Sequence, residues 1–502
     1  MLKENQYSEI TRLTDEILFS SGIRPARVAI VWLHVIREHP VFLKDYDILY
    51  IENKFIFHYR KILRSFRNKA SLFKVFVRSI FLSPVTQWSQ VVQQLSTCDV
   101  LFVSHLLNAE QLSQEGDFYF ADLAVKLREN GYKSLVAYLD VTGMLFPRLS
   151  TQDCNNSHKL VLPRTLSLYE EWRNLKLIWI EYKSLIAKSD VEINKFKKKV
   201  LRYAASEALS SSSLSSLRIA EQVQRIVKIT KPKIIITTHE GHAWERVIYN
   251  AVRESDPNIK CIGYTHAPIF EKQHAVKRSL TKGYNPDVIY TSGIVQKKQL
   301  ENAELLNSIP VEVLGSGRFL GKHIKTTGSK NNKLTCLVIP EGIESEINTL
   351  FQFSLKCSLL LPKVKFIWRL HPKFSFEKLS SENGMYKTLP NNIILSNKSL
   401  QEDFEACEWV LYRGSSAVIQ SVVAGLKPIY LHRSNEMKID PIFGIKTWKC
   451  QVETVLNAQV LFNSGAGNYE DYSKAKQYCL DMYTPLDYGL LVDTLRKMNS
   501  NE

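Results

Sequence analysis

The residues best suited to chemistry stand in short polar motifs that directly follow apolar runs. Arg413-Gly414-Ser415-Ser416 comes after the run 409–412 and opens a predicted helix. The free backbone N–H groups of a helix start, the helix dipole and two hydroxyls together suit a phosphate. A helix cap needs only one hydroxyl. The motif therefore favours phosphate binding over a plain cap.

A second motif, Arg369-Leu-His371-Pro372, ends another predicted strand. Proline stops the strand, and we expect this to direct His371 toward a ligand crevice. A histidine there can donate a hydrogen bond to phosphate or protonate a leaving group, although a turn histidine bonded to backbone is the alternative. Arg369 lies on the same side of the strand and can pair with phosphate or with a buried acid.

Pro340-Glu341-Gly342 follows the first strand of the same region. The glycine permits close approach of a ligand, and the carboxylate can accept hydrogen bonds from a ribose or a base. A plain turn is the alternative interpretation.

An acid with histidines on both sides forms the fourth motif, Thr238-His239-Glu240-Gly-His242. Glu240 is our candidate general base for a hydroxyl nucleophile. No H-E-x-x-H spacing and no third ligand accompany the two histidines, so we expect no metal here. Further candidates for contacts with acceptor or donor are His239 and His242 of this motif, and His266 and Arg278, which follow later strands.

The elements that must position these motifs alternate between short apolar strands and helices. This rhythm predicts an α/β fold of two doubly wound, Rossmann-like domains, with ligands bound at the carboxyl ends of the strands. The stretch 206–216 is rich in serine and is expected to be an exposed loop. The polar stretch 321–333 is expected to be the interdomain linker. The predicted divisions are a helical basic region at 1–95, an acceptor-side domain at 96–320, a nucleotide-sugar-side domain at 334–470 and C-terminal helices at 471–502.

Segment 60–82 carries seven Lys and Arg residues and no acid, with apolar residues near helical spacing. One interpretation is a helix that lies on anionic lipid. The other is a packed helix with a solvated basic face.

Composition narrows the class of protein. The 502 residues are 45% hydrophobic and 23% charged, which is typical of a folded chain of two or three domains. The net charge of +16 indicates an anionic partner. The eight cysteines are scattered with no C-x-x-C pair, so we expect reduced thiols in a cytoplasmic protein. No leader peptide or membrane-spanning run is recognisable.

The sequence lacks the motifs that are typical of several other protein classes. There is no P-loop and no G-x-G-x-x-G, which argues against a P-loop kinase or an NAD enzyme. The D-x-D at Asp45-Tyr-Asp47 lies in a helical region ahead of the first predicted strand, so we do not assign it to a metal. No nucleic-acid recognition module is present, and no nucleic-acid partner is expected.

Two sequential α/β domains, a His-Pro dipeptide after a strand and a Ser-Ser pair before a helix resemble GT-B glycosyltransferases. More narrowly, they resemble bacterial sialyltransferases and Kdo transferases, which use CMP-activated acidic sugars. The resemblance spans roughly residues 98–450. It implies that His371, Ser415 and Ser416 contact the CMP phosphate. The segment EGHAWER at 240–246 also resembles bacterial proteins of surface-carbohydrate (O-antigen or capsule) biosynthesis.

In that group an acidic-acidic-glycine motif of the first domain supplies the catalytic base. The nearest match here, Glu341-Gly342, has proline before it and lies in the second domain. We therefore assign the base to Glu240 and leave Glu341 and Gly342 to donor binding, with Arg369, Pro372, Arg413 and Gly414.

These observations lead to one expected function and leave several alternative functions open. We expect a transferase of a CMP-linked ulosonic or nonulosonic acid, without metal or cofactor, acting on a glycan or lipid-linked glycan at the inner face of the bacterial membrane. The alternatives are a UDP, GDP or CDP donor, including glycerol-phosphate transfer, and a non-catalytic scaffold of glycan assembly.

Overall fold

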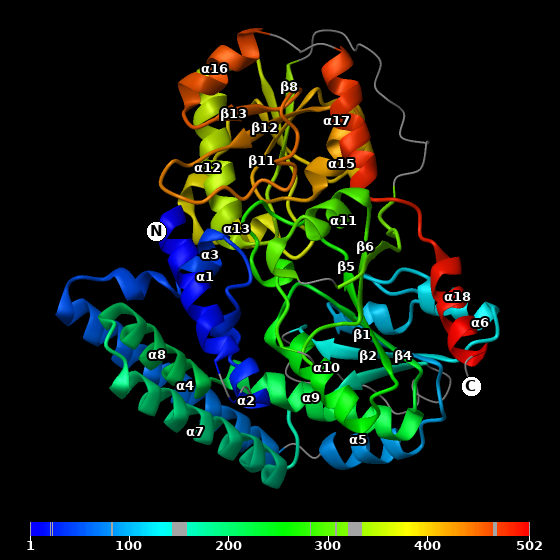
Figure 1. The fold of residues 1–502 in the computed structure, drawn as a ribbon. Coiled ribbons are helices and arrows are strands. Elements are labelled where there is room, and N and C mark those ends of the chain that lie inside the picture. The colour runs from blue at the N-terminus through cyan, green and yellow to red at the C-terminus, as the bar shows by residue number, and fades with distance from the viewer. Residues whose placement is uncertain are drawn as a thin grey trace.

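The computed structural model describes residues 2–20, 22, 24–81, 84–142, 158–281, 283–306, 309–319, 334–464 and 469–500. Two parallel sheets form the centres of two domains, which lie one above the other in Figure 1. The predicted linker 321–333 falls outside the described residues.

The first sheet has seven parallel strands in the order β3-β2-β1-β4-β5-β6-β7. Its central strands are buried along most of their length, which explains their runs of Val, Ile and Leu. The strands are β1 Val100–Leu106, β2 Ser134–Asp140, β3 Lys159–Leu162, β4 Ile234–Thr238, β5 Lys260–Thr265, β6 Val288–Thr291 and β7 Val311–Val313.

The second sheet has six parallel strands in the order β10-β9-β8-β11-β12-β13. In both sheets the strand order reverses beside the first strand, which creates a crevice at the carboxyl ends. The predicted fold class, two Rossmann-like domains with a helical N-terminal region, is confirmed. The strands are β8 Thr335–Ile339, β9 Lys365–Trp368, β10 Ile393–Leu395, β11 Trp409–Tyr412, β12 Lys427–Leu431 and β13 Cys450–Val452.

Helices cover the faces of both sheets (Figure 1). Those of the first domain are α6 Leu123–Glu129, α7 Leu168–Val191, α8 Lys195–Ala208, α9 Ser211–Thr230, α10 Ala243–Ser255 and α11 Ile294–Glu301, with short 3-10 turns at Ala109–Leu112, Ala275–Lys277 and Glu304–Leu306. Those of the second domain are α12 Glu344–Leu360, α13 Phe376–Glu382, α14 Leu400–Ala406, α15 Ala417–Val423, α16 Val455–Ser464 and α17 Tyr469–Met482, with a 3-10 turn at Gly384–Tyr386.

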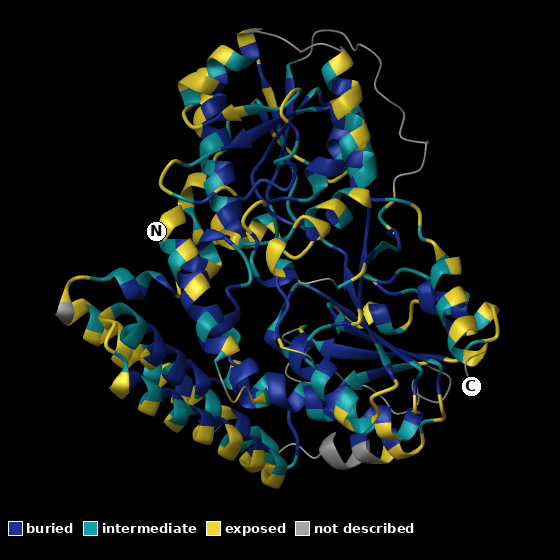
Figure 2. Ribbon diagram, in the orientation of Figure 1, coloured by how far each residue is buried: buried dark blue, intermediate teal, exposed yellow. Residues whose placement is uncertain are grey.

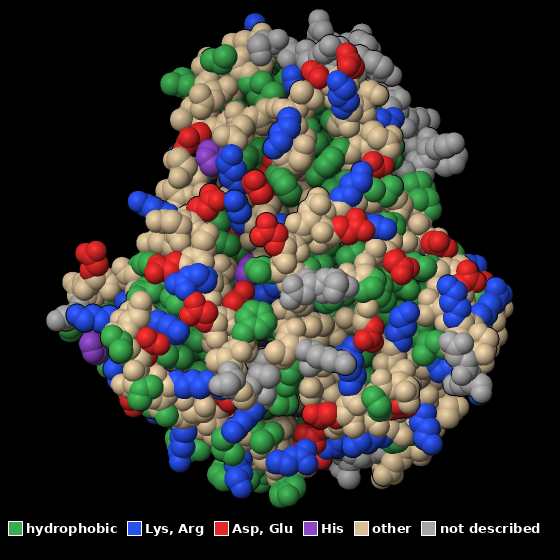
Figure 3. Space-filling view, viewed as in Figure 1, with side chains coloured by type: hydrophobic (Ala, Val, Ile, Leu, Met, Phe, Trp, Pro, Cys, Tyr) green, Lys and Arg blue, Asp and Glu red, His purple; other side chains and the backbone are tan. Residues whose placement is uncertain are grey.

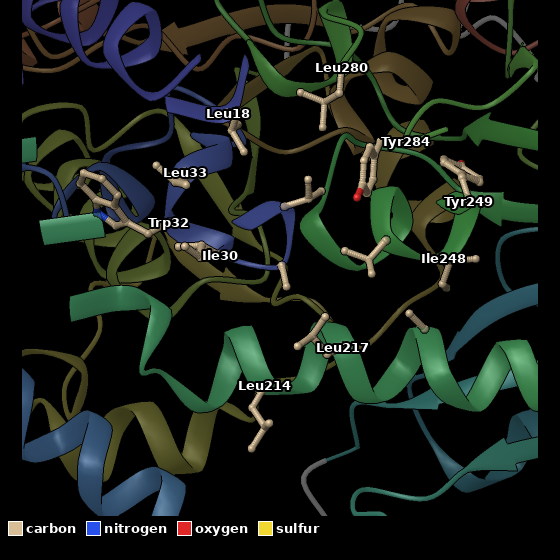
Figure 4. Close-up of a cluster of buried hydrophobic side chains, with 14 of the residues drawn as sticks. Leu18, Ile30, Trp32, Leu33, Leu214, Leu217, Ile248, Tyr249, Leu280 and Tyr284 are labelled. Atoms are coloured by element: carbon tan, nitrogen blue, oxygen red, sulfur yellow. The ribbon is translucent and has the colours of Figure 1, made fainter. Parts of the chain in front are cut away.

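The N-terminal region is helical and shares its core with the first domain. Its elements are α1 Glu4–Phe19, α2 Pro25–Val28, η1 Val31–His34, α3 Pro40–Leu43, η2 Asp47–Tyr50, α4 Lys54–Phe81 and α5 Pro84–Gln93. Leu18 and Leu33 belong to the same buried cluster as Leu214 and Leu217 of α9 (Figure 4). The region is thus packed against the first domain through a continuous apolar core.

The serine-rich stretch is not an exposed loop. Ser210 caps α9 by accepting a hydrogen bond from the backbone N–H of Ser213, and the next serines form the first turns of that helix. Ser213 and Ser216 are buried. Small hydroxyl residues suit this place because they cap the helix and also permit close packing.

The two C-terminal helices belong to different domains. α17 packs on α15 of the second domain. α18 (Tyr488–Ser500) returns to the first domain, where Leu491 and Leu495 join the core around β1 and β4. The chain between them lies against Gly315, whose φ of +85° and contact with the Pro485 backbone leave no room for a Cβ.

Helix α4 has an unusual distribution of exposure. Figure 2 shows yellow, exposed outer faces on the helices at the lower left, where α4, α7 and α8 lie. Phe55, Phe66 and Phe73 of α4 are each 70% or more exposed. None of the described helices is long and apolar enough to cross a membrane.

Candidate active site

Three predicted motifs of the second domain meet at the carboxyl edge of its sheet. Gly342 follows β8 and lies so close to His371, which follows β9, that a Cβ on Gly342 would stand 3.0 Å from the imidazole ring. Glu341 lies against Gly414, which follows β11, and its carboxylate occupies the space that a Cβ there would need. The two glycines therefore allow the acid and the histidine to share one small area.

His371 is set up as a hydrogen-bond donor. The backbone N–H of Lys373 donates to its Nδ1 at 3.3 Å. Burial and the charge of Lys373 lower the pKa of His371, against the opposing charge of Glu341. A neutral ring with Nδ1 accepting carries its proton on Nε2.

The Ser-Ser pair lies at the start of α15. Ser416 is the N-cap residue, and its side chain makes no capping hydrogen bond. Ser415 is buried. The capping interpretation therefore does not account for the Ser416 hydroxyl.

The two arginines of these motifs are occupied by acids. Arg413 is buried and pairs with Glu346 at 2.5 Å and with Glu436. Arg369 donates to the buried Asp403 at 2.7 Å, which is the buried-acid alternative for this residue. Their charges are therefore largely balanced by the protein itself.

At the first sheet, Glu240 follows β4 and lies between two histidines. Its carboxylate is 3.7 Å from Nε2 of His242 and 3.8 Å from Nε2 of His266, which follows β5. Burial acts to raise the pKa of Glu240, but His242, His266 and Arg37 outweigh it and hold that pKa low. The pKa of His242 is raised, because its contact with Glu240 and the charge of Glu245 outweigh burial. Glu240 is consequently ionised at neutral pH, and His242 binds its proton more tightly than an ordinary histidine.

His239 and Arg278 do not join this cluster. His239 is fully buried beneath it, with Nδ1 3.4 Å from Glu245. Arg278 is also buried, and it pairs with Asp15 at 2.9 Å and donates to the His34 carbonyl at 3.3 Å. Both hold elements together: His239 supports the strand end, and Arg278 ties the N-terminal region to the first domain.

An aromatic group that we did not predict surrounds the Glu240 cluster. His105 near the end of β1 lies edge-on to Trp244, with ring centroids 5.4 Å apart. Tyr119 packs edge-on to His266 at 4.5 Å. Burial lowers the pKa of His266 to about 4. The only signal for these residues in the sequence was the position of His105 in a strand that ends at the same sheet edge.

Both sheet edges meet a loop of the N-terminal region, residues 35–39. His39 is fully buried, and its Nε2 lies 2.8 Å from Glu341 of the second domain. Arg37 lies close enough to Glu240 for its charge to lower that residue's pKa. The loop starts at Val35 with φ of +46°, a costly conformation for a β-branched residue. Such strain is common where a loop is held in place for function.

Three of these side chains have the types that bind metal ions. His39, Glu341 and Glu346 place their candidate ligand atoms within 4.8 Å of one another. However, Glu346 already binds the Arg413 guanidinium, and Glu341 binds His39. The cluster is therefore better described as a hydrogen-bonded network than as a metal centre.

Comparisons with known proteins give distant structural likenesses only. MurG from Acinetobacter baumannii is 11% identical with a TM-score of 0.48 over 80% of this chain and 99% of its own. UDP-GlcNAc 2-epimerase from Neisseria meningitidis is 13% identical with a TM-score of 0.42, over 79% and 99%. A glycotransferase of kitacinnamycin is 11% identical with a TM-score of 0.45, over 80% and 100%. No family model and no curated protein matches the sequence. The GT-B architecture assigned here therefore rests on the two parallel sheets and their strand orders.

Proposed function

We propose that this protein is a metal-independent glycosyltransferase that uses a nucleotide sugar. The observation that carries the proposal is the convergence of Glu341, Gly342, His371 and Gly414 at one sheet edge, joined through the loop 35–39 to Glu240 at the other. A transfer between two bound substrates needs polar groups that bind each substrate and hold their reacting atoms close together.

The donor in this proposal carries a single phosphate, as a CMP-linked ulosonic or nonulosonic acid does. The support is the charge near the Ser-Ser turn. Arg413 is balanced by Glu346 and Glu436, and Arg433 lies 2.9 Å from the same Glu436. A diphosphate would need more cations than these arginines, which acids already balance, whereas neutral donors such as Ser416 and His371 suit one phosphate.

In the proposed reaction, the first domain supplies the general base and the second domain stabilises the leaving group. Glu240 accepts the proton of an acceptor hydroxyl while that oxygen attacks the anomeric carbon of the sugar. The bond from that carbon to the phosphate oxygen breaks, and its electrons leave with CMP. The His371 Nε2–H and the Ser416 hydroxyl stabilise the departing phosphate by hydrogen bonds.

The acceptor in this proposal is a surface glycan or lipid-linked glycan at the inner face of the bacterial membrane. The support is α4, on which Phe55, Tyr59, Phe66 and Phe73 are exposed and the charged side chains are all basic. In Figure 3, hydrophobic side chains alternate with Lys and Arg over the lower left, where α4, α7 and α8 lie.

Thermal stabilisation by nucleotides tests the proposal. The purified protein is heated with CMP, CDP, UMP, UDP, GDP or ADP. A nucleotide at about 100 times its Kd should add about 2.7 kcal/mol to the free energy of unfolding. We expect CMP to act, and the His371→Ala and Ser416→Ala variants to lose the effect. Ser381→Ala, which changes an exposed serine of α13, is the matched control and should keep it.

The other outcomes separate the alternatives. Stabilisation by a diphosphate nucleotide alone would replace CMP with another donor. A protein that no nucleotide stabilises would be a scaffold. If CMP binds, loss of sugar transfer in Glu240→Gln with CMP stabilisation retained would support Glu240 as the base.

A further inference from the structure

A groove with several basic and serine side chains in its lining runs between α4 and the start of α9, away from the carboxyl edge of the second sheet. It consists of two adjoining cavities of about 360 Å³ and about 500 Å³. Both cavities are lined by Val31, Ser71, Ser211 and Ser212. The shared lining makes them one continuous groove.

The groove is rich in basic side chains. Its lining includes Arg37, Arg64, Arg67, Lys74, Arg78, Arg164 and Arg218. Three of these are balanced by acids: Arg64 by Asp45 and Glu207, Arg164 by Asp140, and Arg218 by Glu171. Within the described residues, no ion pair is formed by the other four, Arg37, Arg67, Lys74 and Arg78. The groove therefore has positive charge that an anion could neutralise.

Hydrogen-bond donors accompany this charge. Ser71 and Ser211 join their hydroxyls across the groove, so both helices contribute to one polar wall. The backbone N–H groups of Ser211 and Ser212 belong to the first turn of a 20-residue helix, where intrahelical acceptors are lacking. The Nε of Arg37 is buried without a hydrogen-bond partner in the described part of the chain. Donors without acceptors beside uncompensated cations are the features of a phosphate site.

The groove reaches the Glu240 cluster at two points. Trp244 lines one cavity and packs against His105 of the aromatic group at 5.4 Å. Arg37 lines the other cavity and acts electrostatically on Glu240. The groove therefore borders the residues that surround the proposed base.

The opposite face of α4 is apolar and exposed. The residues that line the groove recur at helical spacing at positions 64, 67, 68, 71, 74, 75 and 78. The exposed apolar residues Phe55, Tyr59, Ile62, Phe66, Phe73 and Ile80 follow the same period half a turn away. One helix thus presents a polar face to the groove and an apolar face outward.

We propose that this groove binds the phosphate or diphosphate group of the acceptor and holds the acceptor hydroxyl near Glu240. This inference rests on the proposed transferase function only where it identifies the bound phosphate ester as the acceptor substrate. The ligand chemistry, a phosphate ester, follows from the lining. A phosphate ester that carries a lipid and a soluble sugar phosphate would use the same donors.

Two double variants of equal charge test the site. Arg67→Gln/Arg78→Gln removes two groove cations, whereas Lys61→Gln/Lys69→Gln removes two exposed cations of the same helix that do not line either cavity. Inorganic pyrophosphate binding is measured by calorimetry. We expect the groove variant to lose affinity by about tenfold or more and the control variant by about twofold or less. Equal losses in both variants, or no binding by the unaltered protein, would overturn the proposal.

Vesicles identify the source of the phosphate. Phosphatidylcholine vesicles with and without phosphatidic acid are sedimented with each variant. Phosphatidic-acid-dependent binding that only the groove variant loses assigns the site to lipid phosphate. Pyrophosphate binding without such vesicle binding assigns it to a soluble phosphate ester.

Thermal stabilisation by CMP distinguishes a failure of the groove proposal from a failure of the transferase proposal. Groove variants should retain stabilisation by CMP, since none of the altered residues lies at the second sheet. If no nucleotide binds but pyrophosphate still depends on Arg67 and Arg78, the transferase proposal fails and the phosphate site stands. If CMP and pyrophosphate compete for one site, the groove is not a separate site and the inference fails.

Discussion

Glu38 places a carboxyl group in the interior between the N-terminal region and the first domain. One oxygen accepts a hydrogen bond from the backbone N–H of Lys272 at 2.7 Å, and the other is buried without a hydrogen-bond partner among the described residues. Burial raises the pKa of Glu38 from 4.5 to about 7, although two backbone hydrogen bonds oppose it. The folded protein therefore holds this proton more tightly than the unfolded chain does.

The sign of the resulting pH dependence follows from linkage. The favourable contribution of protonated Glu38 is complete below pH 4.5 and is lost as the pH rises through 7. Glu38→Gln should remove this loss. We expect the variant to gain up to about 3 kcal/mol at pH 8 and much less near pH 5. Urea unfolding at the two pH values measures the difference, and a gain that is the same at both would contradict the assignment.

Gly342 controls the position of His371. A Cβ at position 342 would stand 3.0 Å from the imidazole, so Gly342→Ala should displace the ring by a few tenths of an ångström. We expect the variant to fold but to lose nucleotide affinity by about tenfold if His371 donates to the phosphate. Gly384→Ala is the control, because a Cβ there meets no atom within 4 Å. Unchanged nucleotide binding in Gly342→Ala would exclude His371 from the site.

Single residues differ in how far the sequence predicts them. Strand ends followed by Glu341, His371 and Ser415 could be recognised, because a parallel sheet brings such ends to one edge. His39 could not, since its partner Glu341 is 302 positions away and no local pattern links them. Nor does a sequence distinguish an arginine such as Arg413, balanced by buried acids, from one that is free to bind phosphate.

At the scale of elements, a buried ion pair attaches α2 to α7. Arg27 Nε lies 2.6 Å from Glu181, and both side chains are almost fully buried. Arg27→Met would leave the Glu181 charge without its partner, which typically costs about 3–5 kcal/mol. The double variant Arg27→Met/Glu181→Leu should recover much of that loss. Chemical denaturation of both variants measures the difference; equal stability of the two would show that the pair is not coupled.

Helices and strands also differ in how well the sequence predicts them. The buried strand β11, Trp409–Tyr412, coincides with the apolar run 409–412 because that run is continuous. The edge strands β3 and β13 have four and three residues, too short for a periodic signal. The serine-rich start of α9 has a composition typical of loops, and tertiary packing decides that it is helical.

At the scale of the whole molecule, the first domain depends on α18. Leu491 is fully buried among residues of the first sheet. Leu491→Ala should cost about 2–5 kcal/mol and lower the unfolding temperature of the first domain. Lys497→Ala, at an exposed position of the same helix, is the control. Circular dichroism with and without CMP measures both; we expect nucleotide stabilisation to persist in Leu491→Ala, and its loss would contradict the assignment of CMP to the second domain.

The return of α18 to the first sheet also sets an order of events during synthesis. The described residues 334–464 and 469–482 belong to the second domain, so this domain can fold once they have left the ribosome. The first domain begins earlier in the nascent chain, but residues 488–500 must be made before its core around β1 and β4 is closed. Domains usually mature in the order of translation. Here the domain that starts first is completed last, and the apolar face that awaits α18 stays open while the entire second domain is being made.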